Sequence, residues 1–489
     1  MGKRIAGMKG CGIGWKEPAM IVVFVMAFAN IASGLEYGQE IWNRQFADPI
    51  TALCRIADLS DDGFPDVIAG TGGDRIFCIE TRNGNEWWSA PTGGTIRSVA
   101  DIGDVDADGY ADVAVGTSAN EILCISGGSP SGVGIELWRR TGFNGDIWAI
   151  SPIADLDGDG IPELVAGTDA NEIRCLRGQD GADLWTFPTS GGVRVVIAGP
   201  DVSGDGRPDI LAGGGDGIVY CLNGFDGKLL WQYSGVTTVW ALTWMPDADG
   251  DGYPEVLAGT GDNRVICLSG NPSTNARLRW SFTTGGDVRA LMALPDITGD
   301  GVSDTAAGSA DDRLYLIDGG TGKPIWTQEI GGEILDIATV RDFTRDSIPE
   351  IAIGTALSAV FCQSGRDGAG LWYYPFLNVG DIGNIVAIPD MGDDGVDELV
   401  AASANGELRC LSGSAGLNIY TPGDANCSGD VTIEDVLESL RVLAGIAASP
   451  AIAGCIIGDS TGDSRVDPMD AILSLQTAAG LFPSPGTAP

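Results

Sequence analysis

Short apolar stretches alternate with turn-forming residues along most of the chain. In each repeat an apolar segment, such as the one around Ile150, precedes an aspartate-rich loop, and an apolar run such as residues 66–71 follows the loop. A third apolar stretch (for example residues 122–125) then leads through a Gly/Asp turn to a stretch that carries tryptophan. These stretches are short and have no helical period, so each is expected to be a strand. Four strands per repeat predict the blade of a β-propeller.

The aspartate-rich loop recurs eight times, starting at Asp58, Asp104, Asp155, Asp201, Asp247, Asp296, Asp342 and Asp390. Steps of 46 to 51 residues separate the copies, which is a period typical of propeller blades. Twenty residues after each loop start lies Cys78, Cys124, Cys175, Cys221, Cys267, Leu316, Cys362 or Cys410. Thirty to 34 residues after it lies Trp88, Trp138, Trp185, Trp231, Trp280, Trp326, Trp372 or Tyr420. Because the Cys and Trp positions keep a nearly constant distance from each loop start, the sequence predicts an all-β, eight-bladed propeller over residues 35–421. A seven-bladed ring is the alternative.

The strand that closes the ring has two candidates. Trp42 lies 16 residues before the first loop, in phase with the later tryptophans. An early strand that completes the last blade would remove the open edges of the ring. Tyr420 occupies the same phase, so the choice between the two stays open.

The repeated loop has the spacing of a calcium ligand set. Side-chain oxygens at positions 1, 3, 5 and 9, the carbonyl of position 7 and a glycine at position 6 suit a hard cation in a tight turn. The alternative is an Asp-Gly turn that is held by hydrogen bonds without metal. The predicted ligands are Asp58, Ser60, Asp62, Phe64, Asp66, Asp104, Asp106, Asp108, Tyr110, Asp112, Asp155, Asp157, Asp159, Ile161, Glu163, Asp201, Ser203, Asp205, Arg207, Asp209, Asp247, Asp249, Asp251, Tyr253, Glu255, Asp296, Thr298, Asp300, Val302, Asp304, Asp342, Thr344, Asp346, Glu350, Asp390, Asp394, Val396 and Glu398.

Carboxylate count ranks these loops. The loops that start at Asp104, Asp155 and Asp247 offer four carboxylates each and are expected to bind Ca²⁺ most tightly. The loop that starts at Asp342 has Ser347 in place of glycine and Arg345 inside it, so it is expected to be the weakest.

Near residue 422 the pattern changes to a twelve-residue loop followed by a helical run, and this unit occurs twice, as in a pair of half EF-hands. The second unit ends near residue 481, and residues 482–489 are expected to be a flexible tail. The predicted ligands here are Asp424, Asn426, Ser428, Asp430, Thr432, Asp435, Asp459, Thr461, Asp463, Arg465, Asp467 and Asp470. With the eight propeller loops, the chain would hold up to ten Ca²⁺ ions.

Three families resemble parts of this sequence. The Asp loops with their following strands, as in residues 155–167, resemble the FG-GAP/VCBS calcium-binding repeats of extracellular propellers. The turn and Trp segments at 226–231 and 321–326 are similar to the tryptophan-docking motif of quinoprotein (PQQ-like) propellers, which implies tryptophans packed between the blades of an eight-bladed ring. Residues 422–481 resemble a type I dockerin, which implies a cohesin partner. They depart from its Ser-Thr pair, with Ile433-Glu434 and Pro468-Met469 at these positions.

The N-terminus indicates a secreted protein, and the net charge limits the partners it can have. Residues 1–34 read as a signal peptide, with Lys3, Arg4, Lys9 and Lys16 before an apolar run at 19–29 that is short for a membrane span. An uncleaved anchor is the alternative. The net charge of −39 disfavours nucleic acid as a partner.

The periodic cysteines are expected to be buried free thiols, because equivalent positions on neighbouring blades should be too far apart to bridge. Cys54 and Cys78, within one blade, are a weak candidate pair for a disulfide. Cys427 and Cys455 are the better candidate pair, and their state stays open.

A ring of large side chains emerges when the blades are aligned. Seven residues before each loop start lie Thr51, Arg97, Trp148, Arg194, Trp240, Arg289, Leu335 and Gly383. These positions fall on the innermost strand, so Arg97, Trp148, Arg194, Trp240 and Arg289 are expected to form a cationic, aromatic face at the central channel. Guanidinium groups suit carboxylates and indole faces suit sugar rings, which predicts an anionic glycan as ligand. The alternative is that these side chains only fill the channel or stack on one another.

The sequence contains no catalytic constellation. It has no histidine, no adjacent Cys pair and no nucleophilic Ser motif. We therefore expect a secreted, calcium-stabilised binding or structural module, attached through its dockerin-like domain to a cohesin or cell-surface assembly. A polysaccharide lyase or another carbohydrate-active enzyme is the alternative, since one lyase family resembles this architecture. A quinone-dependent dehydrogenase is less favoured.

Overall fold

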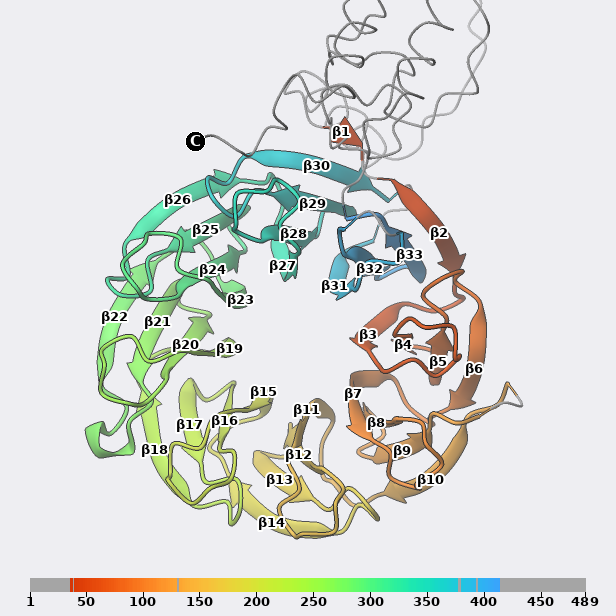
Figure 1. Ribbon diagram of the computed structural model, residues 1–489. Coiled ribbons are helices and arrows are strands. Elements are labelled where there is room, and N and C mark those ends of the chain that lie inside the picture. Colours follow the sequence, from red (N-terminus) through yellow and green to blue (C-terminus); the bar gives the residue numbers. More distant parts are fainter. Residues whose placement is uncertain (1–35, 38, 130–131, 377–379, 393–394, 414–489) are drawn as a thin grey trace, which may run out of the picture. The chain divides into compact units, whose positions relative to one another are not determined.

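Figure 1 shows the sheets of this chain standing around a common centre, each with one strand innermost and one outermost. The computed structural model describes residues 36–37, 39–129, 132–376, 380–392 and 395–413. These residues form eight sheets of four antiparallel strands, one of which gains a fifth, parallel strand. The eight-bladed propeller is confirmed, and the seven-bladed alternative is wrong.

The four antiparallel strands of each of blades 1 to 7 follow one another in sequence. Blade 8 takes its outermost strand from the N-terminal side, and blade 7 gains its fifth strand from there. The strands are given from the innermost outward. Blade 1 has β3 (Ile50–Arg55), β4 (Val67–Thr71), β5 (Arg75–Ile79) and β6 (Glu86–Pro91), and blade 2 has β7 (Ile96–Gly103), β8 (Asp112–Thr117), β9 (Ile122–Ser126) and β10 (Ile135–Arg140). Blade 3 has β11 (Ile147–Ile153), β12 (Glu163–Thr168), β13 (Glu172–Leu176) and β14 (Asp183–Pro188), and blade 4 has β15 (Val193–Ala198), β16 (Ile210–Gly214), β17 (Ile218–Leu222) and β18 (Leu229–Ser234). Blade 5 has β19 (Val239–Met245), β20 (Glu255–Thr260), β21 (Arg264–Ser269) and β22 (Leu278–Thr283), and blade 6 has β23 (Val288–Leu294), β24 (Asp304–Ser309), β25 (Arg313–Ile317) and β26 (Pro324–Glu329). Blade 7 has β27 (Ile334–Val340), β28 (Glu350–Thr355), β29 (Ala359–Gln363), β30 (Gly370–Pro375) and the added β1 (Glu36–Tyr37). Blade 8 has β31 (Ile382–Ile388), β32 (Glu398–Ser403), β33 (Glu407–Leu411) and β2 (Glu40–Gln45).

The hydrophobic core lies between neighbouring blades. Every residue of the second strands β8 and β12 is buried, whereas the outermost strand β14 has only exposed and half-buried positions. A strand with a blade on each face reads as a continuous apolar run, which explains the runs seen in the sequence. Packing is close: a Cβ on Gly116 would lie 2.8 Å from Cγ2 of Ile147 on the next blade.

The ring is closed by the strand that carries Trp42. Strand β2 pairs antiparallel with β33 and places Trp42 opposite Cys410, the same register that places Trp88 opposite Cys78 in blade 1. Tyr420, the other candidate, lies outside the described residues. Strand β1 pairs parallel with β30, so the N-terminal segment joins blade 7 as well as blade 8.

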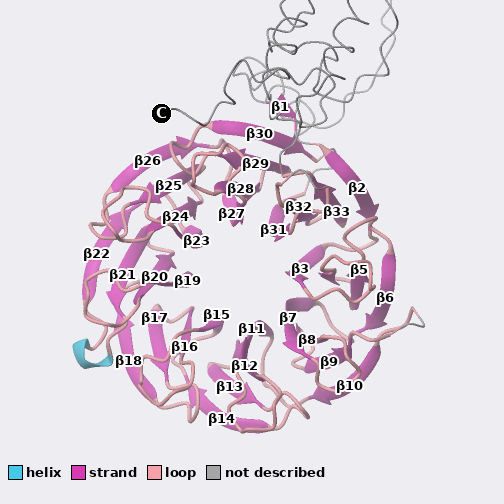
Figure 2. Ribbon diagram, viewed as in Figure 1, coloured by secondary structure: helices cyan, strands magenta, loops and turns pink. Residues whose placement is uncertain are grey.

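The described residues contain strands and one 3₁₀ turn, η1 (Pro272–Thr274), as Figure 2 shows. Among these residues there is no helix of the length and apolarity that crossing a membrane requires.

Eight cysteines lie in this part of the chain and all are free thiols. The weakly predicted Cys54–Cys78 bridge is therefore wrong, because strand β4, through Ile68, lies between the two residues. The expected signal peptide, dockerin-like domain and tail, with Cys427 and Cys455, lie outside the described residues.

Candidate functional site: the aspartate loops and the inner ring

Each aspartate-rich loop joins the innermost strand of a blade to the second strand, and its own backbone shapes it. In the loop between β11 and β12, the Asp155 carboxylate accepts the backbone N–H groups of Gly158 at 2.6 Å and Gly160 at 2.9 Å. The carboxylate at position 9, Glu163, accepts the N–H of Leu156 at 2.5 Å. Both glycines have φ near +90°, which a residue with a Cβ rarely adopts.

Three loops bring their carboxylates together. Oxygens of Asp104, Asp106 and Asp108, of Asp155, Asp157, Asp159 and Glu163, and of Asp247, Asp249 and Asp251 each lie within 4.8 Å of one another. These are the three loops with four carboxylates, the ones expected to bind Ca²⁺ most tightly. Glu163 adds a second observation: its side chain is buried, and Oε1 has no hydrogen-bond partner. An unpaired buried carboxylate oxygen beside three others fits an oxygen-liganded cation.

The electrostatics of the loops follow from burial and backbone contacts. Burial raises the pKa of Glu163 and of Asp66, both at position 9, to about 7, with smaller contributions from the neighbouring loop carboxylates. At position 1 the N–H of Gly158 and then that of Gly160 lower the pKa of Asp155. A bound cation would therefore favour the ionised form most strongly at the position-9 carboxyl, whose pKa burial has raised.

The loop that starts at Asp342 departs from the pattern of the others. In the loop after β27, Ser347 stands where the other loops have glycine and is held at φ +70°, and Arg345 has φ +62°. Arg366 pairs with Asp346 of the same loop at 2.8 Å. The low calcium affinity expected of this loop stays a prediction. In the loop after β31, Asp394 lies outside the described residues.

The residues predicted to line the ring lie on the innermost strands and contact one another. The guanidinium of Arg97 lies 4.4 Å from the Trp148 ring centroid, and that of Arg194 lies 4.6 Å from Trp148 and 5.6 Å from Trp240. Arg289 lies 5.4 Å from Trp240. The five side chains thus alternate in an unbroken series of cation–π contacts. The remaining ring positions, Thr51, Leu335 and Gly383, lie on β3, β27 and β31.

Two of the three arginines in the ring are paired with carboxylates, which reduces the positive charge of the ring. Arg97 pairs with Asp146 at 3.0 Å, and Arg289 pairs with Glu333 at 2.9 Å. Each of these acids belongs to the next blade and lies nine residues before the loop start, two before the ring position. At the corresponding position the blade after Arg194 has Thr238, so Arg194 has no ion pair among the described residues.

The two ring tryptophans also differ. The indole N–H of Trp148 donates to Asp169 at 2.6 Å. The corresponding residue in the blade of Trp240 is Gly261, and Nε1 of Trp240 is buried without a partner. The carboxylates of Asp146, Glu333 and Asp169 were absent from the predicted site, although the first two recur in register with the arginines and were detectable in the alignment of blades.

A cavity of about 410 Å³ adjoins the ring on the side of blades 5 to 8 and 1. Trp240 and Arg289 form part of its wall, and it is completed by Ile50, Leu335, Asp381, Gly383, Asn384 and Ala404. An indole, a guanidinium, a carboxylate and an amide at one cavity provide both stacking and hydrogen bonding.

Comparisons with known proteins identify the kind of repeat. Residues 179–243 match the model of the lambda-carrageenase beta-propeller domain. Residues 215–412 match the PQQ-like model described as outer membrane protein assembly factor BamB. Residues 215–412 are therefore similar to PQQ-like repeats of the BamB type, and the described residues form an eight-bladed propeller. A search of curated proteins found no match.

Solved structures resemble the fold at low sequence identity. Sqt1 of Saccharomyces cerevisiae has a TM-score of 0.64 and 11% identity, and the match covers 77% of this chain and 99% of Sqt1. The computationally designed protein Ika8 has a TM-score of 0.56 and 15% identity, with 77% and 100% covered. BamB of Moraxella catarrhalis has a TM-score of 0.52 and 17% identity, with 76% and 97% covered. At these identities the likeness concerns the propeller fold alone.

Proposed function

We propose that this protein is an extracellular, calcium-stabilised propeller that binds an acidic glycan at the inner ring. The observation that carries the proposal is the position of Arg194, which lies between the indoles of Trp148 and Trp240 and has no ion pair among the described residues. A guanidinium held between two aromatic faces is positioned to bind a sulfate or carboxylate while the indoles stack on sugar rings.

Two further observations support a glycan at this place. The cavity beside Trp240 offers Asp381 and Asn384, whose oxygens and amide suit sugar hydroxyl groups. The segment similar to the lambda-carrageenase propeller domain, residues 179–243, contains both Arg194 and Trp240.

In this proposal the aspartate loops serve the scaffold. They lie at the opposite end of the innermost strands from the ring, since each strand begins near the ring residue and ends at its loop. The unpaired Oε1 of Glu163 supports Ca²⁺ as the group that holds these carboxylates together. The proposed docking of residues 422–481 on a cohesin extends this function to an assembly, and calcium-dependent capture of the full chain by a cohesin domain would test it.

The test of the glycan proposal measures binding of acidic and neutral oligosaccharides to the full chain by calorimetry. Arg194→Ala is expected to weaken binding of the acidic ligand about tenfold or more, because a hydrogen bond to a charged group contributes about 1.5–3 kcal/mol. Lys228→Ala, which removes an exposed positive charge from a turn of blade 4 outside the ring, is the matched control and should bind as the wild type does. Equal affinity of the wild type and Arg194→Ala for every acidic glycan would overturn the proposal.

The same incubation distinguishes a binding module from a polysaccharide lyase. A binding module leaves the polysaccharide intact. Growth of absorbance at about 235 nm would instead reveal a lyase, because elimination creates an unsaturated sugar.

A further inference from the structure

We propose that the guanidinium of Arg279 is the resident cation of the loop 247–255, so that this loop folds without Ca²⁺. The proposal rests on the calcium sites proposed above and concerns which of the loops takes the metal. It reverses the expectation, drawn from carboxylate count, that this loop is among the tightest calcium sites.

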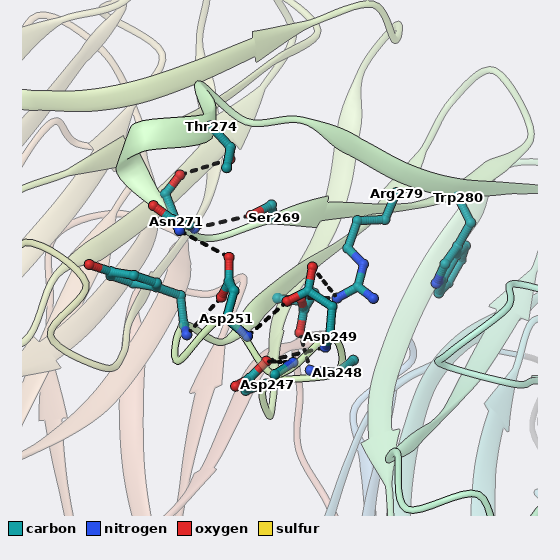
Figure 3. Close-up of polar contacts among 12 residues, drawn as sticks. Asp247, Ala248, Asp249, Asp251, Ser269, Asn271, Thr274, Arg279 and Trp280 are labelled. Carbon is teal, nitrogen blue, oxygen red and sulfur yellow. Dashed lines mark hydrogen bonds and ion pairs between the residues drawn. The ribbon is translucent and has the colours of Figure 1, made fainter.

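Arg279 reaches its loop from strand β22, directly beside the blade tryptophan Trp280. Its side chain is 11% exposed and forms an ion pair with Oε1 of Glu255, whose side chain is 1% exposed. The same Nη1 lies 3.4 Å from Oδ2 of Asp249. Figure 3 shows the Arg279 side chain extending towards Asp249 and the loop. One buried positive charge thus contacts positions 3 and 9 of the predicted ligand set.

Blade 3 provides the matched loop without this arginine. Glu163 and Glu255 both stand at position 9, and both accept the backbone N–H of position 2 through Oε2. The other oxygen of Glu255 binds Arg279, whereas Oε1 of Glu163 is buried without a partner. In blade 3 the residue before the tryptophan is Leu184, and the six remaining blades also have an apolar residue there. Blade 5 is therefore the exception, with a charged residue at a position that is apolar in the other blades.

Loop 155–163 also has an arginine nearby, but in a different place. Arg177 pairs with Asp157 at 3.0 Å and with Asp180 at 3.2 Å, and its side chain is 35% exposed. It approaches from the surface and leaves position 9 untouched. A calcium ion in loop 247–255 would have to displace a buried ion pair and then lie beside a buried positive charge, and both requirements oppose metal binding.

Calcium stoichiometry of the full chain tests the proposal. Native mass spectrometry would compare the wild type with Arg279→Leu, which copies Leu184, and with Glu163→Gln. We expect Arg279→Leu to bind one more Ca²⁺ than the wild type and Glu163→Gln to bind one fewer. Thermal unfolding with chelator and with excess Ca²⁺ gives an independent readout, in which Arg279→Leu should lose stability on chelation by more than the wild type.

The outcomes separate the two proposals. An unchanged count in Arg279→Leu together with a lost ion in Glu163→Gln would overturn the role of Arg279 and leave the calcium sites standing. An unchanged count in Glu163→Gln would overturn the calcium site of blade 3 itself. If Arg279→Leu does not fold, Glu255→Gln decides: with Arg279 as the cation it binds as many ions as the wild type, and a lost ion contradicts the inference.

Discussion

The indole N–H of Trp42 donates a 2.6 Å hydrogen bond to the backbone carbonyl of Thr81, 39 residues further along the chain. The same bond joins every other pair of neighbouring blades: Trp88 to Gly127, Trp138 to Gly178, Trp185 to Gly224, Trp231 to Gly270, Trp280 to Gly319, Trp326 to Gly365 and Trp372 to Gly413. Trp42 belongs to blade 8 and Thr81 to blade 1, so the bond that links successive blades also closes the ring.

Replacement of Trp42 by phenylalanine should therefore weaken the closure. Trp42 is 8% exposed, and Trp42→Phe leaves the Thr81 carbonyl without its donor. A buried polar group that loses its partner costs about 1–3 kcal/mol, and we expect a loss of that size in chemical unfolding. Trp87→Phe is the control, because the Trp87 indole N–H is buried without a partner. Equal losses in the two variants would show that the hydrogen bond contributes nothing.

The glycines that pack against several blade tryptophans give a second prediction. Gly227 has φ +69°, and a Cβ there would lie 2.5 Å from Cε3 of Trp185 on the preceding blade. Gly142 has φ +90° with nothing within 4 Å of a Cβ. Gly142→Ala should cost only the backbone strain, about 1–2 kcal/mol, and Gly227→Ala should cost about 1–3 kcal/mol more through overpacking against the indole. Thermal or urea unfolding measures the difference, and equal costs would contradict the docking contact.

The period of the aspartate loops was enough to predict the blade count, the four strands of each blade and the positions that face the centre. Periodicity predicts what all blades share, and that includes the ring positions of Arg194 and Trp240. It did not decide between Trp42 and Tyr420, because both have the same phase and only backbone pairing distinguishes them. Strand β1 has no counterpart in any other blade, so the repeat held no signal for it.

The polar contacts between blades were not predicted, although the acids concerned recur in register with the arginines. The pairing of Arg97 with Asp146 depends on which side chains of two blades meet, and the spacing within one blade does not specify this. Arg279 was missed because carboxylates were counted within the loop, while the cation that pairs with Glu255 arrives from a strand 24 residues later. A ligand count therefore ranks metal sites correctly only where no side chain from outside the loop supplies a positive charge.

The cysteines of the propeller should behave as inert thiols. Burial raises the pKa of every one of the eight described thiols, and that of Cys54 rises to about 12. Because the thiolate is the reactive form, iodoacetamide at neutral pH should leave these cysteines unmodified in the native protein and modify them after denaturation. Peptide mass mapping before and after denaturation checks this, and rapid native labelling of Cys78 or Cys124 would contradict their burial.

Asp336 predicts a pH dependence of stability. Its Oδ2 accepts the backbone N–H of Ile385 on the next blade at 2.9 Å, and Oδ1 accepts that of Ile337 at 2.9 Å. Burial raises the pKa of this carboxyl from 3.8 to about 7 despite both hydrogen bonds. Between about pH 4 and 7 the folded protein therefore binds more protons than the unfolded chain, so the contribution of Asp336 to stability is fully present below this window and is lost as the pH rises through it.

Asp336→Asn should remove that part of the pH dependence. The corresponding residue of blade 8 is already an asparagine, Asn384. Relative to the wild type, the variant should be more stable at pH 8 than at pH 4, by at most about 4 kcal/mol, because each pKa unit corresponds to about 1.4 kcal/mol and the side chain is partly exposed. Urea unfolding of both proteins at fixed Ca²⁺ across this range measures the difference, and Asp74→Asn, at an exposed turn, controls for the loss of one negative charge. Parallel stability curves for Asp336→Asn and the wild type would show that Asp336 is already ionised in the folded protein, with the Ile385 N–H outweighing the cost of burial.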